Sequence, residues 1–168
     1  MNQYTDNLYL QFLHDLEDQG FKGDLRQDYG TRLVTATDNS IYQVMPQAVV
    51  FPKDTEDLKL VLKLSAEKQY QKISLTPRGG GTGTNGQSLS EGIIVDCSRH
   101  MNQILELNLD EAWVRIQPGV VLDQLNDYLK PHGVFFAPNV SPSSRATLGG
   151  MINTDACGKG SRVYGRTS

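Results

Sequence analysis

The sequence predicts an α+β fold, because strand-like and helix-like segments alternate in its first half and a hairpin pattern follows them. Short apolar runs at residues 48–51, 72–76 and 92–96 are typical of buried strands, and a helical pattern lies between the first two. Alternating apolar and polar residues on both sides of Asp110-Glu111 then indicate an antiparallel hairpin. A β-α-β segment followed by such a hairpin favours α+β over a doubly wound sheet.

Three stretches carry the period of an amphipathic helix. The first, residues 5–19, ends at Gly20, and the second follows an apparent N-cap pair, Asp54 with Asp57, and runs to about residue 69. The third covers residues 121–130 and is followed by proline and glycine, which end helices. The expected inner faces are Leu8, Phe12, Leu13 and Leu16 in the first helix, Leu58, Val61, Leu62 and Ser65 in the second, and Leu122, Leu125 and Leu129 in the third.

Two stretches lack a clear period. Residues 23–40 are polar and rich in turn-forming residues, and residues 135–168 are rich in Gly, Ser, Thr and Asn. So many small polar residues in the last third suggest a chain that lies against a ligand or cofactor. A plain surface loop is the alternative.

Composition and charge exclude several classes of partner. The 16 basic and 19 acidic residues leave a net charge of −3 with no concentration of either sign, which argues against nucleic acid or an anionic membrane. No apolar run reaches the roughly 18 residues of a transmembrane segment, and the first residues lack the pattern of a signal peptide. Two cysteines, Cys97 and Cys157, suit a reducing compartment. A soluble cytoplasmic protein is expected.

The glycine-rich stretch PRGGGTGTNGQ, residues 77–87, lies between two predicted strands. Its spelling fits G-x-G-x-x-G, but that dinucleotide fingerprint needs a helix to begin at the loop, and a strand follows here instead. It also fits the Walker A pattern except that Gln87 stands in place of the lysine that contacts the β- and γ-phosphates. Neither phosphate motif is complete.

The physical properties of the stretch still favour an anion site. Five glycines permit positive φ angles and remove side chains that would keep a ligand away from the backbone. Successive N–H groups in such a loop can form an anion-binding nest, to which Thr82, Thr84 and Asn85 add short donors and Arg78 adds a charge. The stretch therefore predicts backbone binding of a pyrophosphate, and a flexible linker or tight surface turn is the alternative.

Three motifs in a fixed order carry a family resemblance. The glycine-rich stretch followed by GIIVD, then residues 116–133, then residues 137–168, resemble the FAD-binding domain of the vanillyl-alcohol oxidase/p-cresol methylhydroxylase (PCMH-type) superfamily. The resemblance implies a PCMH-type fold of two subdomains over residues 46–168, preceded by an N-terminal helix and extended lead-in at residues 1–45. It also implies that the second subdomain is incomplete at the C-terminus.

The resemblance implies a set of FAD-binding residues as well. The glycine-rich stretch would hold the pyrophosphate, and the later A-T-L-G-G and G-x-G-x-x-x-Y-G motifs would lie along the flavin and the ribityl chain. Thr82 stands where some relatives attach FAD through a histidine, so the FAD is expected to be non-covalent. The implied residues are Arg78, Gly79, Gly80, Gly81, Thr82, Gly83, Thr84, Asn85, Thr147, Gly149, Gly150, Asn153, Thr154, Ala156, Gly158, Ser161, Tyr164 and Gly165.

Within the superfamily, the chain looks most like the large bacterial dehydrogenases of D-2-hydroxy acids that combine FAD with iron–sulfur centres. The resemblance implies hydride transfer from a small-molecule 2-hydroxy acid, D-2-hydroxyglutarate in the first place, to flavin N5, giving 2-oxoglutarate. Electrons would then leave through iron–sulfur clusters in a missing C-terminal part to an electron acceptor.

The catalytic base and any metal ligand are also expected in that missing part, so no residue here is assigned to either role. His100 is expected to be a partnered structural or surface residue, and these residues alone are expected to be inactive. A non-catalytic nucleotide-binding remnant, or a flavin reductase of the same fold, are the alternatives.

Overall fold

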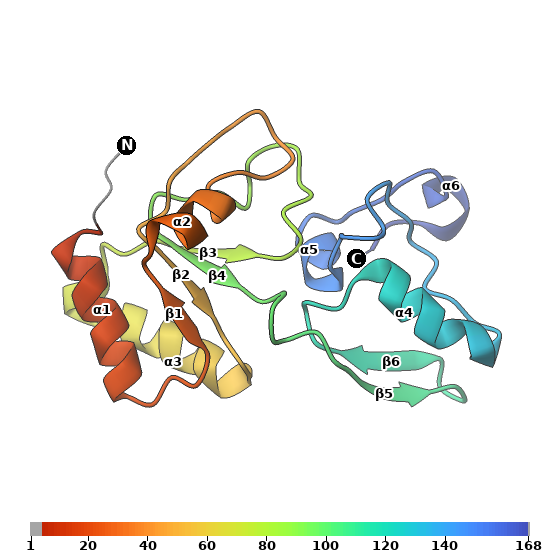
Figure 1. The fold of residues 1–168 in the computed structure, drawn as a ribbon. Helices are drawn as coiled ribbons and strands as arrows, with labels where there is room; N and C mark the ends of the chain where they lie inside the picture. Colours follow the sequence, from red (N-terminus) through yellow and green to blue (C-terminus); the bar gives the residue numbers. More distant parts are fainter. Residues whose placement is uncertain (1–4, 168) are drawn as a thin grey trace. The chain divides into compact units, whose positions relative to one another are not determined.

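The computed structural model describes residues 5–167 and divides the chain into two compact units, residues 1–100 and residues 101–168 (Figure 1). The first unit contains α1 (Asn7–Asp18), β1 (Asp24–Arg26), α2 (Tyr29–Thr35), β2 (Ala48–Phe51), α3 (Thr55–Ser65), the 3₁₀ helix η1 (Lys68–Tyr70), β3 (Leu75–Arg78) and β4 (Ile93–Asp96). The second contains β5 (Ile104–Asn108), β6 (Trp113–Ile116), α4 (Leu122–Leu129), η2 (Lys130–His132), α5 (Leu148–Asn153) and α6 (Ser161–Tyr164).

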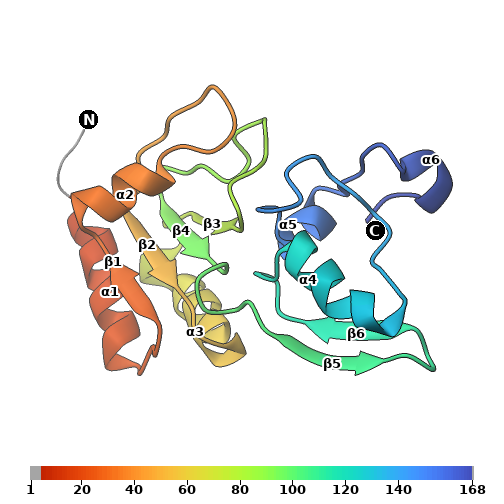
Figure 2. The same ribbon diagram turned by 45° about the vertical axis from the view of Figure 1, so that its right-hand side comes forward.

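The first unit is a four-stranded sheet in the order β1-β2-β4-β3 (Figure 2). β4 runs parallel to both β2 and β3, and β1 pairs antiparallel with β2 at the edge. The β2-α3-β3 segment confirms the predicted β-α-β unit. β3 begins at Leu75 rather than at Lys72 and includes Pro77, which an edge strand tolerates because one side of its backbone needs no partner.

Both faces of this sheet are covered. Alternate residues of β2 point to opposite faces, so all four of its residues are buried. One face packs against α1 and α3, and the other carries a smaller cluster of Val49, Phe51 and Ile94. The larger core consists of Phe12, Leu13, Leu16, Ala48, Val50, Val61, Leu64, Tyr70, Ile73, Ile93 and Val95.

Two expectations for the first unit were wrong. The predicted inner face of α3 included Leu62, which is 61% exposed, whereas the structure buries Asp57, Val61 and Leu64. Asp57 is drawn inward because its carboxylate accepts the backbone N–H groups of two residues outside the helix. Residues 23–40, which showed no clear period, form β1 and α2.

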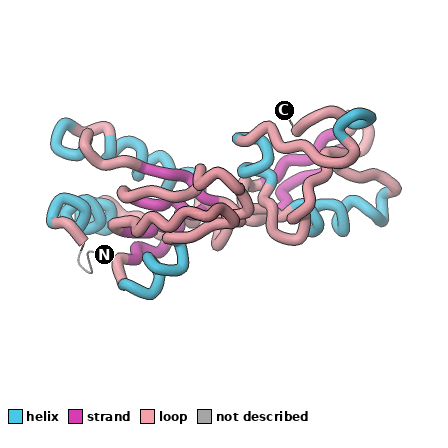
Figure 3. The backbone as a smooth tube through the Cα atoms, turned by 90° about the horizontal axis from the view of Figure 1, so that it is seen from above, coloured by secondary structure: helices cyan, strands magenta, loops and turns pink. Residues whose placement is uncertain are grey.

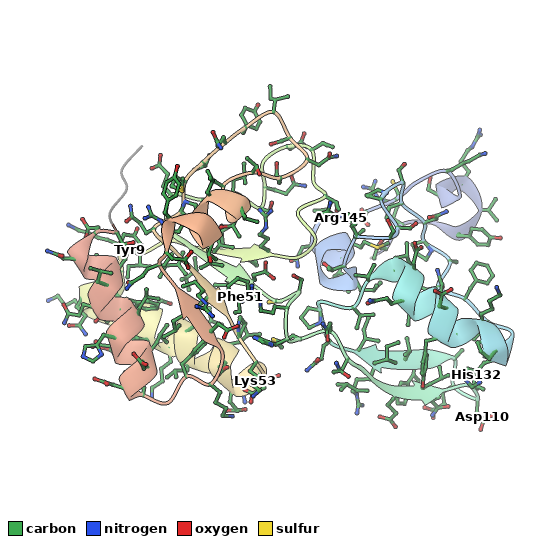
Figure 4. All side chains as sticks on the ribbon, viewed as in Figure 1. Tyr9, Phe51, Lys53, Asp110, His132 and Arg145 are labelled. Atoms are coloured by element: carbon green, nitrogen blue, oxygen red, sulfur yellow. The ribbon has the colours of Figure 1, made fainter. Side chains whose placement is uncertain are left out.

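The second unit packs two helices on a hairpin. β5 and β6 pair antiparallel, as predicted, and Asp110 lies at the turn between them (Figure 4). Leu122, Leu125 and Leu129 of α4 are buried, as the helical pattern predicted. With α5 they cover one side of the hairpin, and loop backbone makes up much of the chain after α4 (Figure 3). In residues 5–167, no helix has the length and apolar character needed to cross a membrane.

Candidate functional site

The glycine loop, residues 79–92, connects two parallel neighbouring strands without a helix. β3 ends at Arg78, β4 begins at Ile93, and the strands run side by side in the same direction. A parallel connection has to return along the sheet, and proteins usually place a helix there. Because this loop has no helix or strand of its own, its backbone groups lack the partners that such an element would supply.

Six successive backbone N–H groups at the start of the loop, from Gly79 to Thr84, have no acceptor within the described part of the chain. All six residues are partly or fully exposed. The next N–H group, that of Asn85, donates to Oε1 of Gln87 at 3.1 Å. Residues 79–90 contain no acidic side chain. A run of unpaired donors without a carboxylate in the same segment fits an anion with several oxygens, such as a pyrophosphate.

Two glycines of the loop have left-handed backbone, Gly81 with φ 62° and Gly86 with φ 74°. A Cβ atom at Gly81 would lie 2.6 Å from Nη2 of Arg78, and one at Gly86 would lie 3.0 Å from Cδ2 of Tyr42. Glycine is therefore required at both positions, by the backbone angle and by a close neighbour.

Arg78 supports the loop from inside the first unit. Its Nη2 atom donates to the carbonyl oxygen of Thr37 at 2.7 Å, and its Nη1 atom lies 3.3 Å from both the carbonyl oxygen of Thr35 and Oγ of Ser88. Ser88 Oγ in turn donates to Oδ2 of Asp38 at 3.0 Å. The guanidinium is thus engaged by protein acceptors under Gly81. Its assignment to the pyrophosphate stays a prediction.

The Asp38 carboxylate keeps its charge beside this network. Burial alone would raise the pKa of Asp38, but hydrogen bonds from Ser40 and Ser88 and the charge of Arg78 outweigh burial and lower it. The carboxylate therefore stays ionised and balances the guanidinium.

In the second unit, the A-T-L-G-G motif forms the start of α5 rather than an irregular loop. Thr147 is the N-cap residue, and its Oγ1 atom accepts the N–H of Gly150 at 3.4 Å. The N–H of Leu148 donates to the carbonyl oxygen of Val120 at 2.8 Å, which ties this helix start to the chain before α4.

Gly149 and Gly158 lie where two backbone segments approach too closely for a side chain. A Cβ atom at Gly149 would be 2.7 Å from Cβ and 2.9 Å from the carbonyl oxygen of Pro118, and one at Gly158 would overlap the carbonyl oxygen of Asn139. Both glycines therefore serve the packing of the second unit. A contact of either with FAD stays a prediction.

The polar side chains after these glycines bond to their own helix. Nδ2 of Asn153 donates to the carbonyl oxygen of Gly149 at 2.8 Å, and Oγ1 of Thr154 donates to that of Gly150 at 2.9 Å. Such bonds satisfy the last turn of a short helix.

The G-x-G-x-x-x-Y-G motif forms α6 and its end. Gly165 ends α6 with φ 79°, a positive backbone angle that favours glycine. A Cβ atom at Gly165 would have no described atom within 4 Å. The ring of Tyr164 meets that of Phe135 edge to face, with 5.8 Å between ring centroids.

The predicted residues thus fall into two groups, one in each unit. Residues 78–85 lie together in β3 and the glycine loop, and residues 147–165 lie together in α5, α6 and their connection. Sequence reasoning missed Asp38 and Tyr42, which contact the glycine loop from the segment before β2. The turn-forming sequence around Asp38 was the available signal, but it does not reveal a partner fifty residues away.

His100 lies outside both groups and is partnered, as expected. Its Nε2 atom is 2.9 Å from Oδ2 of Asp24, which also accepts from Nη1 of Arg99 at 3.2 Å. The hydrogen bond with His100, aided by Arg99, lowers the pKa of Asp24. Within residues 5–167, no group of three His, Cys, Asp or Glu side chains is arranged to hold a metal ion.

Comparison with known sequences gives a family match and close relatives. Residues 46–168 match the family described as FAD binding domain. The D-2-hydroxyglutarate dehydrogenase of Escherichia coli (strain K12) is 62% identical over 161 residues, which cover 96% of this chain and 16% of that protein. The chain therefore spans about one sixth of the length of this curated relative.

Comparison with solved structures confirms the predicted α+β, PCMH-type fold. An alkyldihydroxyacetonephosphate synthase matches with a TM-score of 0.84 at 23% identity, covering 99% of this chain and 32% of that one. A p-cresol methylhydroxylase matches with a TM-score of 0.69 at 16% identity, covering 91% of this chain and 31% of that one. At these identities the likeness establishes the fold and nothing about the substrate.

Proposed function

Because the chain belongs to the FAD binding domain family, we propose that its glycine loop binds the pyrophosphate of FAD. The observation that carries this proposal is the run of six backbone N–H groups, Gly79 to Thr84, without acceptors among the described residues. Polarised N–H groups bind anions well, and the two left-handed glycines leave no side chain in the way. Arg78, Thr82, Thr84 and Asn85 complete the assigned pyrophosphate segment.

The second unit contributes residues that lie along the flavin and the ribityl chain. The exposure of Asn153, Thr154, Tyr164 and Gly165 supports this assignment, because exposed groups are accessible to a ligand. The assigned residues are Thr147, Gly149, Gly150, Asn153, Thr154, Ala156, Gly158, Ser161, Tyr164 and Gly165. The FAD is held without a covalent bond, because residues 79–92 contain Thr82 and no histidine or cysteine.

The protein that contains this chain oxidises a D-2-hydroxy acid to a 2-oxo acid, with D-2-hydroxyglutarate as the substrate. The 62% identity to the Escherichia coli D-2-hydroxyglutarate dehydrogenase supports this choice. Bound FAD would supply a hydride acceptor, its N5 atom, for the hydrogen on C2 of the hydroxy acid. These residues hold and orient the cofactor, and none of them is assigned as the base that takes the hydroxyl proton. Iron–sulfur clusters outside these residues would supply the route by which electrons reach an acceptor. The whole protein would be cytoplasmic.

The visible absorption spectrum of the full-length protein tests the cofactor assignment. We expect a flavin spectrum whose chromophore stays in the supernatant after acid precipitation, since the flavin is not covalently attached. A folded but colourless protein would contradict the proposal.

Anaerobic addition of substrate tests the reaction. D-2-hydroxyglutarate is expected to bleach the flavin band, and L-2-hydroxyglutarate is the control that should not. A flavin that stays oxidised with D-2-hydroxyglutarate but is reduced by NADPH would instead support a flavin reductase of the same fold.

A further inference from the structure

The loop before β2, residues 37–43, is closed at its base by a β-bridge and contains an internal hydrogen bond. Thr37 and Gln43 form an antiparallel bridge, and within the loop Oδ1 of Asp38 accepts the N–H of Ser40 at 2.8 Å. This 37–43 loop lies beside the glycine loop in two views of the first unit (Figures 1 and 2). It is therefore a preformed support rather than a loose connection.

The 37–43 loop contacts the glycine loop at both of its left-handed glycines. The N–H of Asn39 donates to the carbonyl oxygen of Gly81 at 3.0 Å. The ring of Tyr42 lies so close to Gly86 that a Cβ atom there would be 3.0 Å from Cδ2. The two left-handed positions of the glycine loop are thus the positions that the 37–43 loop contacts.

A side-chain network joins the same two loops below these contacts. Asp38 accepts from the hydroxyl of Ser88, which is 9% exposed, and Ser88 lies 3.3 Å from Nη1 of Arg78. Nη2 of Arg78 returns to the 37–43 loop by donating to the carbonyl oxygen of Thr37 at 2.7 Å. These hydrogen bonds therefore connect the end of β3, the glycine loop and the 37–43 loop to one another.

We propose that Asp38, acting through Ser88 and Arg78, is a positioning residue that holds the glycine loop in its cofactor-binding conformation. The inference rests on the proposed function, because the ligand it serves is the FAD pyrophosphate. Asp38 does not touch the ligand in this account. It fixes the loop so that the N–H groups of Gly79 to Thr84, which have no acceptor in the described part of the chain, stay open to the ligand.

The charges favour this division of roles. A carboxylate so close to a pyrophosphate site repels the ligand unless a cation balances it, and Arg78 supplies that balance. The guanidinium is engaged by Thr37, Thr35 and Ser88, so the attraction for the anion rests mainly on backbone N–H groups. Asp38 therefore acts by ordering the loop and adds no affinity by charge.

The test is the affinity of the flavin-free full-length protein for FAD, measured by quenching of flavin fluorescence. Asp38→Ala and Ser88→Ala are each expected to raise the dissociation constant about ten-fold, because each removes a hydrogen bond in a network with charged members. Ser88→Thr keeps the hydroxyl and is expected to restore most of the affinity. Glu91→Gln removes one exposed charge from the same loop and should leave the affinity unchanged.

Two further readouts separate positioning from general stability. The Asp38→Ala/Ser88→Ala double variant should bind FAD no more weakly than the weaker single variant, since both changes break one network. The thermal midpoint of the flavin-free variants should stay close to that of the wild type. A strongly lowered midpoint would assign Asp38 to fold stability and overturn the inference.

The remaining outcomes are also decisive. Wild-type affinity in Asp38→Ala, or additive losses in the double variant, would overturn the inference while leaving the FAD assignment in place. A wild-type protein that binds no FAD would overturn the proposed function and the inference with it.

Discussion

Replacing Gly81 by alanine tests whether the glycine loop needs its left-handed backbone to bind FAD. Gly81 has φ 62°, and a new Cβ atom would lie 2.6 Å from Nη2 and 3.1 Å from Cζ of Arg78. The guanidinium has little room to yield, because Nη2 donates to the carbonyl oxygen of Thr37 at 2.7 Å. The substitution therefore forces either a new backbone conformation or the loss of that hydrogen bond.

The size of the effect follows from these two conflicts. Left-handed backbone costs alanine about 1 kcal/mol, and losing a hydrogen bond from a charged donor costs about 2 kcal/mol. The unfolded chain does not enter a binding equilibrium, so the two costs add to about 3 kcal/mol. This corresponds to a roughly 160-fold change in an equilibrium constant. Because the exposed loop can relax without ligand, we expect most of this change as weaker FAD binding.

The assay is an FAD titration of the flavin-free full-length protein, followed by flavin fluorescence. Gly133→Ala is the matched control, because Gly133 has φ 72° and a Cβ atom there would have no described atom within 4 Å. It should lower the free energy of unfolding by about 1 kcal/mol and leave FAD affinity unchanged. Equal affinity of the wild type and Gly81→Ala would refute the reasoning.

Three further predictions concern stability and thiol reactivity. Tyr70→Phe removes a buried hydroxyl that donates to Asp15, so the free energy of unfolding in urea should fall by about 2 kcal/mol. Burial, aided by Asp15, raises the pKa of Tyr70. The free energy of unfolding of the wild type should therefore fall as the pH rises above about 10, the pKa of tyrosine in the unfolded chain. In Tyr70→Phe this decrease should be smaller. Gly149→Ala would place Cβ 2.7 Å from Cβ of Pro118 and should lower stability by about 2 kcal/mol. Burial raises the pKa of Cys97 to about 11, so at about pH 8 it should react with a thiol reagent far more slowly than the exposed second cysteine.

Each of these predictions has a control in the same chain. Tyr128→Phe changes an exposed ring, so the free energy of unfolding should stay that of the wild type. The decrease in stability above about pH 10 should also be unchanged. Gly150→Ala would meet Thr147 Oγ1 at 3.2 Å and no backbone atom of another segment, so it should be nearly neutral. Cys97 and Cys157 should react at equal rates after unfolding. Equal rates in the native protein, or equal stability losses in test and control variants, would contradict the assigned environments.

The helices with one clear apolar side could be predicted because a single core lies on that side. Phe12, Leu13 and Leu16 of α1 are buried as their spacing indicated. In α3 the spacing favoured Leu62, yet Asp57 takes an inner position because its carboxylate accepts the backbone N–H of Lys22, 35 residues away, and that of Lys53, just before the helix. A hydrophobic period cannot reveal a buried residue whose partners are backbone groups elsewhere in the chain.

β1 and α2 were missed because their pattern is short and partly polar. β1 has three residues, and the buried face of α2 carries Arg32, whose Nε atom donates to the carbonyl oxygen of Pro46 at 2.7 Å. A charged residue at an inner position hides the apolar period that marks a helix.

In the glycine loop, too, local features could be predicted from the sequence and a long-range contact could not. Its composition predicted positive φ angles and accessible N–H groups, and both follow from local chemistry. Its support by Asp38 depends on a contact between loops fifty residues apart. That contact becomes visible only when the sheet brings the segments before β2 and after β3 together.

Hydrogen exchange of the full-length protein, with and without bound FAD, tests the central claim most directly. We expect the amides of Gly79 to Thr84 to exchange rapidly in the flavin-free protein, because they have no acceptor among residues 5–167, and to become strongly protected when FAD binds. Equal exchange of these amides in the two states, with FAD demonstrably bound, would contradict the assignment of the glycine loop to the pyrophosphate.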